Sequence, residues 1–201
     1  MGLFNLFPTV VYQESTGIIP NKDEMSVLSS FQGIQSGLGN IQSDQPIFDL
    51  PGLDRIKNVI MKHIQIYFYE VMKVNQATEI YMTDNWLNYT QKGQEHKMHT
   101  HTNSIISAVY YLQVKNTVPC LSFNRQQPKF PLDFPHNSYD EKNADEWTIE
   151  VVEGDVVVFP SNVYHHVKPN YSDHARISIA VNTFVKGPIG SSLTGIDATI
   201  K

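Results

Sequence analysis

The sequence predicts a mainly β protein with flanking helices, in which the strands form a sandwich or a barrel such as a jelly roll. Short segments of strand composition follow one another from residue 79, and an amphipathic helix precedes them. The length of 201 residues suits one domain with one buried core. The segments that we expect to be strands are Glu79–Tyr89, Lys97–His101, Ile105–Gln113, Leu121–Asn124, Trp147–Val151, Val156–Phe159, His165–Lys168 and Arg176–Phe184.

The elements before residue 79 are expected to support this sheet. Residues 8–13 have strand composition, and a helix is expected from about Lys22 to Gln32. A longer helix is predicted from Asp49, as N-cap, through Pro51 in the first turn to about Lys73. Its apolar residues recur at spacings of three and four, which predicts one buried face formed by Leu53, Ile56, Ile60, Ile64, Tyr67 and Val71.

We therefore predict one domain over residues 1–201, with support elements in 1–78, a β core in 79–185 and an exposed tail in 186–201. A long connection between Asn124 and Trp147 holds several prolines and aromatic residues. Such a segment is either an active-site lid or a surface excursion. As a lid, it would cover a substrate with Phe130, Phe134 and Tyr139.

Composition and charge argue against several classes of protein. The formal net charge of −5 offers no basic surface for nucleic acid. Cys120 is the single cysteine, so neither an internal disulfide nor a cysteine-based zinc knuckle can form. The N-terminus lacks a signal-peptide pattern, and the apolar runs are too short to cross a bilayer. We expect a cytoplasmic protein that binds neither membrane nor nucleic acid.

The histidines form two clusters that predict a metal site. On a strand, His99 and His101 would project from the same face with Cα atoms roughly 6.5–7 Å apart, so both imidazoles could reach one ion. His165 or His166, from a later strand, would be the third ligand. Imidazole suits Fe, Zn, Cu and Ni. His96 is expected to be a supporting or exposed residue, and the alternative is that all are surface or hydrogen-bonded core histidines.

Arg176 and Ser178 would share one face of a strand eleven and thirteen residues after His165. A buried guanidinium needs an anion, and a carboxylate is its natural bidentate partner. That carboxylate belongs either to a ligand or to a protein Asp or Glu. The hydroxyls of Tyr89, Tyr110 and Tyr111 are candidates to help hold such a ligand, although aromatic residues in barrels are more often core.

The order of these residues resembles that of the Fe(II)- and 2-oxoglutarate-dependent oxygenases, in the prolyl-hydroxylase-like branch, over roughly residues 80–185. The chain is also similar to the small oxygenases of bacteria and their phages, and host cytoplasm is expected if it is phage-encoded. The motifs that carry the resemblance are Asn88-Tyr89, His99-Thr100-His101, Ser107-Ala108-Val109-Tyr110-Tyr111-Leu112, Gly154-Asp155-Val156-Val157-Val158-Phe159-Pro160, His165-His166-Val167-Lys168-Pro169 and Arg176-Ile177-Ser178-Ile179.

The resemblance implies a double-stranded β-helix (jelly-roll) core and the use of Fe(II), 2-oxoglutarate and O2. It selects His165 over His166 as the third metal ligand, because Val167 and Pro169 fall in the family's register. The implied site residues are His99, His101 and His165 for the metal, and Arg176, Ser178, Tyr89 and Tyr111 for 2-oxoglutarate. His101 departs from the family, which usually has Asp or Glu there, and the exchange makes the site one charge unit more positive.

The activity that the resemblance implies is hydroxylation of a C–H bond with release of succinate and CO2. A prolyl residue in a peptide or protein is the family-level expectation for the substrate, and small molecules remain open. Two alternatives use the same residues differently. One is a three-histidine, cupin-like dioxygenase or zinc hydrolase that does not use 2-oxoglutarate. The other is a jelly-roll binding module without catalysis.

Overall fold

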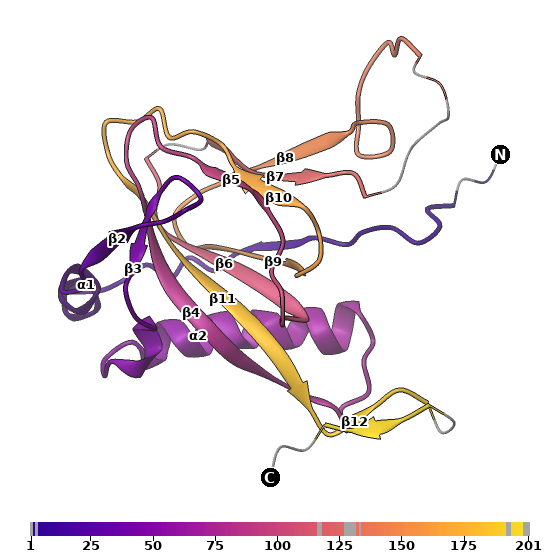
Figure 1. The fold of residues 1–201 in the computed structure, drawn as a ribbon, viewed down its shortest axis with the longest axis horizontal. Helices are drawn as coiled ribbons and strands as arrows, with labels where there is room; N and C mark the ends of the chain where they lie inside the picture. Colours follow the sequence, from indigo (N-terminus) through magenta and orange to yellow (C-terminus); the bar gives the residue numbers. More distant parts are fainter. Residues whose placement is uncertain are drawn as a thin grey trace.

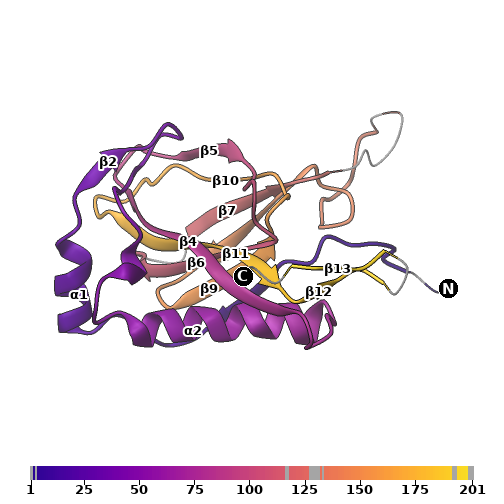
Figure 2. The ribbon, with the colours of Figure 1, turned by 60° about the horizontal axis from the view of Figure 1, so that its bottom comes forward.

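A computed structural model describes residues 2, 4–115, 118–126, 132, 134–191 and 194–198. Two antiparallel sheets form the body, and Figure 2 shows them as separate layers above helix α2. The larger has the order β1-β9-β6-β11-β4-β3-β2, and the smaller β5-β10-β7-β8. The strands are β1 Tyr12–Ser15, β2 Gly33–Gln35, β3 Ile41–Ser43, β4 Glu79–Thr90, β5 His96–His99, β6 Ile106–Gln113, β7 Val118–Asn124, β8 Glu146–Val151, β9 Asp155–Pro160, β10 His165–Val167 and β11 Arg176–Lys186.

This arrangement is the predicted jelly roll, and all eight strands expected after residue 79 are present with small shifts of their ends. Long-range pairing joins them, with β11 between β4 and β6 (Figure 1). The first strand lies at Tyr12–Ser15, later than the predicted 8–13, because its pairing with β9 starts at Tyr12. Strands β2 and β3 were not predicted. They form because β3 pairs with β4, a tertiary contact that a short polar segment does not signal locally.

Two helices precede the core. Helix α1 (Lys22–Ser29) begins at a capping box in which Asn21 and Glu24 satisfy each other's backbone amides. Helix α2 (Asp54–Gln65) runs beneath the larger sheet (Figure 1) and continues as the π-helix η2 (Ile66–Val71). The prediction that Asp49 caps this helix was wrong, because residues Ile47–Asp49 form the separate 3-10 turn η1.

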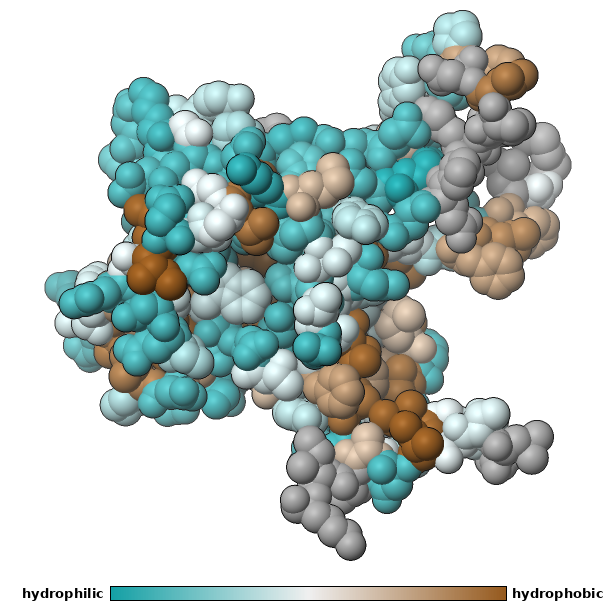
Figure 3. All heavy atoms as spheres, viewed as in Figure 1, coloured by the Kyte–Doolittle hydropathy of each residue, from teal (hydrophilic) through white to brown (hydrophobic). Residues whose placement is uncertain are grey.

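The predicted apolar face of α2 is buried except at its end. Ile56, Ile60 and Ile64 are fully buried, whereas Val71 is 38% exposed. A π-turn contains more residues per turn than an α-helix and therefore rotates the residues that follow off the buried face. Figure 3 shows hydrophobic side chains on the surface beside this end of α2, where Met72 is also exposed.

The core has two parts because side chains alternate across the larger sheet. On β6, Tyr110 packs with the α2 side chains, whereas Tyr111 points between the two sheets. Cys120 lies beside Tyr111 in the inner cluster. The inner space between the sheets therefore receives every second residue of β4, β6 and β11, and this alternation positions the site.

The segments at the edges differ partly from expectation. Residues 186–201, expected as a tail, contain the hairpin β12 (Pro188–Ile189) with β13 (Ile196–Asp197). In the long connection, Phe134 and Tyr139 are exposed, and Phe130 lies outside the described residues. The lid therefore stays a prediction. Within the described part of the chain, no helix is long and apolar enough to cross a membrane.

Candidate metal centre and adjoining pocket

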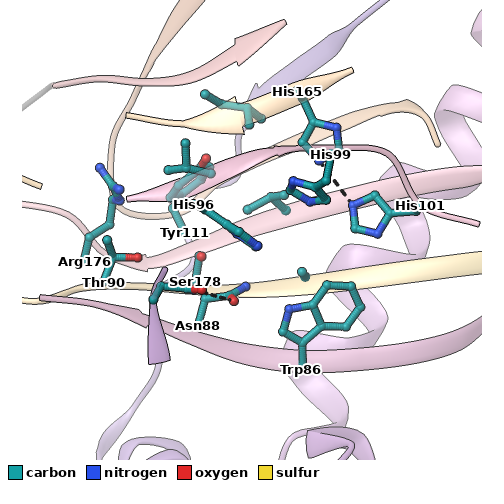
Figure 4. A pocket seen from close by; sticks show the side chains of 15 residues that line it. Trp86, Asn88, Thr90, His96, His99, His101, Tyr111, His165, Arg176 and Ser178 are labelled. Atoms are coloured by element: carbon teal, nitrogen blue, oxygen red, sulfur yellow. Dashed lines mark hydrogen bonds between the residues drawn. The ribbon is translucent and has the colours of Figure 1, made fainter. Parts of the chain in front are cut away.

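Three histidines converge between the sheets. One potential ligand nitrogen from each of His99, His101 and His165 lies within 4.8 Å of those of the other two. His99 is the last residue of β5 and His165 the first of β10, and the two are opposite each other in the strand register. The Nε2 atoms of His101 and His165 are 3.2 Å apart (dashed in Figure 4). Such a spacing allows all three imidazoles to bind one ion.

His101 reaches this cluster by a different route from the predicted one. Strand β5 ends at His99, so His99 and His101 are not neighbours on one strand face. The chain turns after His99, and the backbone amide of His101 donates to the carbonyl of Ser161 at 2.9 Å. This hydrogen bond, rather than strand periodicity, returns the His101 side chain to the cluster.

Backbone carbonyls orient two of the three rings. The Nδ1 atom of His99 lies 2.7 Å from the carbonyl oxygen of Lys97, and that of His165 lies 2.9 Å from the carbonyl oxygen of Val163. A carbonyl can only accept, so each Nδ1 carries the proton and each Nε2 has a free lone pair. Fixing the tautomer in this way is the usual second contact of a metal-binding histidine.

Burial keeps these imidazoles neutral. It lowers the pKa of His165 to about 3 and that of His101 to about 4, and it also lowers the pKa of His99. Neighbouring histidines add to the effect, because a second positive charge so close is unfavourable. Neutral imidazole is the form that binds metal ions, so at pH 7 the cluster is ready to bind one without losing protons.

A pocket extends from this cluster to Arg176, and Figure 4 shows the histidines at one end and Arg176 at the other. Arg176 is 5% exposed, and its Nη2 donates to the carbonyl of Lys168 at 2.8 Å. Among the described residues, no Asp or Glu forms an ion pair with it, and none lines the pocket. The guanidinium thus lacks the anion that a buried positive charge requires.

Ser178 and Tyr111, which we predict to contact the co-substrate, line the same pocket. The Tyr111 hydroxyl, fully buried, accepts from the Cys120 thiol with a Sγ to Oη distance of 3.6 Å, which leaves its own proton to donate. Burial raises the pKa of Tyr111 well above its ordinary value, so it stays protonated.

The structure does not bring Tyr89 to the pocket, and the expectation of a co-substrate contact for it was wrong. Its side chain packs against the α2 core, and its hydroxyl donates to the carbonyl of Leu28 at 2.8 Å. The neighbours on β4, Asn88 and Thr90, line the pocket instead. They lie opposite Ser178 and Arg176 in the register of β11, a pairing that could have identified them.

Two other histidines occupy clearly different positions. His166 points away from the pocket, with its Nδ1 3.3 Å from Oδ1 of Asn124 and its Nε2 3.6 Å from Glu146. His96, expected as a supporting or exposed residue, is only 7% exposed, and its ring stacks on His99 with 4.5 Å between centroids. A register shift between β5 and β10 turns both His96 and His99 inward.

Three buried polar atoms have no hydrogen-bond partner among the described residues and belong to residues that line this pocket. They are Oδ1 of Asn40, Nε1 of Trp86 and Nε2 of His96. Buried polar groups are almost always hydrogen-bonded, so these atoms indicate a polar ligand. No sequence pattern identified Asn40 or Trp86, because the segments that carry them meet only in the folded sheet.

Comparison with known proteins agrees with this geometry. Residues 84–182 match the model of the family described as "Putative 2OG-Fe(II) oxygenase". This match, together with the fold, indicates a 2-oxoglutarate-dependent non-haem iron oxygenase. Enzymes of this family use Fe(II), 2-oxoglutarate and O2. No curated protein matches the chain in sequence.

Solved structures show the same fold. A 2OG-Fe(II) oxygenase from Burkholderia pseudomallei is 13% identical, with 86% of this chain and 83% of that chain covered and a TM-score of 0.59. A prolyl-4-hydroxylase from Pseudomonas putida is 14% identical, with 87% and 92% covered and a TM-score of 0.56. HygX from Streptomyces hygroscopicus, solved with nickel, 2-oxoglutarate and hygromycin B, is 11% identical, with 87% and 82% covered and a TM-score of 0.59.

The residues present fit an iron ion and a dicarboxylic oxo acid. The neutral imidazoles are suitable ligands for a divalent first-row metal, and the buried Arg176 has no acidic partner in the part of the chain that the structure describes. The three converging residues are all histidines, whereas the usual iron site of this kind has two histidines and one carboxylate.

Proposed function

We propose that this chain binds Fe(II) through His99, His101 and His165, binds 2-oxoglutarate in the adjoining pocket, and hydroxylates a C–H bond of its substrate. One observation carries the proposal: a pocket between the sheets joins three converging, neutral histidines to a buried arginine that has no acidic partner among the described residues. When bound, Fe(II) with 2-oxoglutarate and O2 supplies the chemistry that inserts one oxygen atom into the C–H bond, and the oxo acid leaves as succinate and CO2.

The chain's own residues bind and orient the oxo acid. Arg176 would hold the carboxylate far from the metal, with Ser178 and the Tyr111 hydroxyl as additional donors. The inner core around Tyr111 and Phe159 is apolar and closely packed. This wall limits the access of water to the reacting atoms and strengthens the electrostatic contact of Arg176 with an anion.

Arg176 separates this function from the alternatives. A three-histidine enzyme that does not use 2-oxoglutarate would give the buried guanidinium no ligand, and a binding module would need no oriented histidines. The exchange of the usual carboxylate for His101 supports an anionic co-substrate, because a divalent ion bound by three neutral imidazoles keeps its full charge of two units.

For the substrate, we propose a prolyl residue in a peptide or protein, which is the family-level expectation. A cleft of about 620 Å³, within the range of ligand-binding sites, is lined in part by two neighbours of His165. Phe123 and Val163 line it. The centroids of the Phe123 and His165 rings are 6.3 Å apart, and Nδ1 of His165 donates a hydrogen bond to the Val163 carbonyl. The cleft also contains the half-exposed Trp147, which offers a surface for a pyrrolidine ring.

The experiment incubates Fe(II)-loaded protein with 2-oxoglutarate, O2 and a library of proline-containing peptides, and measures succinate and a mass gain of one oxygen atom. His99→Ala is expected to abolish both products, whereas Trp147→Ala is expected to reduce peptide oxidation more than succinate formed without peptide. Succinate formation without oxidation of any peptide would overturn the prolyl substrate, and equal succinate formation by His99→Ala would overturn the metal site.

A further inference from the structure

The fourth histidine of the cluster, His96, has no place in the proposed metal site. Its side chain is not among the three converging ligands, yet it is 7% exposed and lines the same pocket as Arg176 and Ser178. Its Nε2 is completely buried without a hydrogen-bond partner among the described residues. A buried polar atom without a partner destabilises the folded state, so a ligand that pairs with it would remove this disadvantage.

The position of His96 is fixed from two sides. Its ring stacks on His99 with an interplanar angle of 23°, and its backbone lies opposite Val167 of β10. The next residue donates its backbone amide to the carbonyl of Leu38 at 2.9 Å. In Figure 4 the ring lies between Arg176 and the metal-binding histidines, so a molecule that spans the pocket would pass it.

The charges that line the pocket indicate which kind of ligand would pair with Nε2 of His96. Its described lining contains Arg176 and four histidines but no Asp or Glu, so an anion is favoured over a cation. Faced with a carboxylate oxygen, the imidazole takes the tautomer with the proton on Nε2 and donates it. Both carboxylates of a 2-oxo dicarboxylic acid would be suitable acceptors.

We propose that His96 is a positioning residue for the co-substrate, whose Nε2–H donates a hydrogen bond to a carboxylate oxygen of bound 2-oxoglutarate. This inference rests on the proposed function, because it requires that 2-oxoglutarate occupies the pocket. It assigns to His96 a role in binding the oxo acid and none in binding the metal, although its ring touches the ring of His99.

The test compares His96→Phe, which keeps a ring to stack on His99 but has no ring nitrogen, with His96→Gln, which keeps a terminal N–H donor. The matched control is His166→Phe, the same exchange at a histidine that follows a metal ligand but faces away from the pocket. Fe(II) affinity is measured by competition with a chelator without 2-oxoglutarate. The Kd of 2-oxoglutarate is measured by anaerobic titration of the Fe(II)-loaded protein, followed by its visible charge-transfer absorption.

We expect His96→Phe to raise the Kd of 2-oxoglutarate about 10- to 100-fold, the value of a hydrogen bond to a charged group, with Fe(II) affinity within about threefold of the wild type. His96→Gln is expected to recover most of this loss, and His166→Phe to change neither constant. Repeating the titration with 2-oxopentanoate, which lacks the distal carboxylate, identifies the acceptor: a loss that persists assigns the carboxylate beside the ketone, and a loss that disappears assigns the distal one.

An unchanged Kd of 2-oxoglutarate in His96→Phe would overturn the inference, as would an equal loss of Fe(II) and 2-oxoglutarate affinity, which would mean that His96 only supports His99. Failure of the wild-type protein to bind 2-oxoglutarate would be a different result, since it would overturn the proposed function itself.

Discussion

Replacement of Arg176 by Met is expected to affect stability and ligand binding in opposite directions. The guanidinium is buried, and among the described residues its one hydrogen bond goes to the carbonyl of Lys168. Burial of an unpaired charge costs several kcal/mol, whereas the lost hydrogen bond contributes about 1.5–3 kcal/mol. We therefore expect the unliganded variant to have an unfolding free energy equal to that of the wild type, or up to about 2 kcal/mol higher.

The Arg176→Met variant should bind 2-oxoglutarate much more weakly than the wild type does. Removal of one partner of a buried charge pair costs about 3–5 kcal/mol, so the Kd of 2-oxoglutarate should rise at least about 100-fold. At a concentration of 100 times the wild-type Kd, the ligand adds about 2.7 kcal/mol to the stability of the wild type but only about 0.4 kcal/mol to the variant. For a chain of this size, the wild-type Tm should rise by roughly 5–11 °C and the variant's by about 1–2 °C.

The assay is thermal unfolding of the Fe(II)-loaded protein under anaerobic conditions, with and without 2-oxoglutarate. Arg55→Met provides the contrast, because Arg55 pairs with Glu24 at 2.5 Å and the Glu24 side chain is only 4% exposed. That variant should lose about 1–3 kcal/mol of stability and keep the ligand-induced shift. A loss of 3–5 kcal/mol in unliganded Arg176→Met would refute the reasoning, since it would mean that a protein carboxylate pairs with Arg176.

Three further predictions follow from the site and the core. The pKa values of His101 and His165 are about 4 and 3, so Fe(II) affinity should change less than about tenfold between pH 8 and 5.5. Three exposed histidines of pKa 6.5 would lose roughly 1000-fold in affinity over the same range. Competition with a chelator measures the affinity, and a steep fall in affinity below pH 6.5 would contradict this prediction. His101→Asp should keep the metal but weaken 2-oxoglutarate binding about tenfold through the lost positive charge, and tighter binding in the anaerobic titration would contradict the charge argument. Ile60→Ala should reduce the unfolding free energy by about 2–5 kcal/mol in denaturant titrations, and a loss below 1 kcal/mol would show that α2 does not seal the core.

The pH dependence of stability has a defined sign. Folding lowers the pKa of His63, mainly by burial, and does the same to the histidines between the sheets. In the unfolded chain these histidines become protonated near pH 6.5, whereas in the folded protein they stay neutral to a lower pH. Their contribution to stability is therefore complete above pH 6.5 and is lost as the pH falls towards about 3–4.

Strand positions and the three converging histidines were predictable because they depend on local composition and on order along the chain. The eight segments after residue 79 contain enough β-branched and aromatic residues to indicate strands without tertiary information. The grouping of His99, His101 and His165 was also anticipated, although the reason given for His101 was not the one found.

What the sequence could not reveal depends on the register between strands. Tyr89 and Asn88 are adjacent, and only the pairing of β4 with β11 decides which of them faces the pocket. His96 is turned inward by an irregularity in the pairing of β5 with β10, which no periodicity predicts. Asn40 reaches the pocket because the short hairpin of β2 and β3 joins the edge of the larger sheet.

The most direct test of the central claim is the anaerobic addition of 2-oxoglutarate to the Fe(II)-loaded protein, observed in the visible spectrum and followed by admission of O2 and measurement of succinate. The account predicts a charge-transfer band that is absent in His99→Ala and requires far more 2-oxoglutarate in Arg176→Met, and then succinate. Tight Fe(II) binding without any such band would contradict it and would favour a three-histidine enzyme that does not use 2-oxoglutarate.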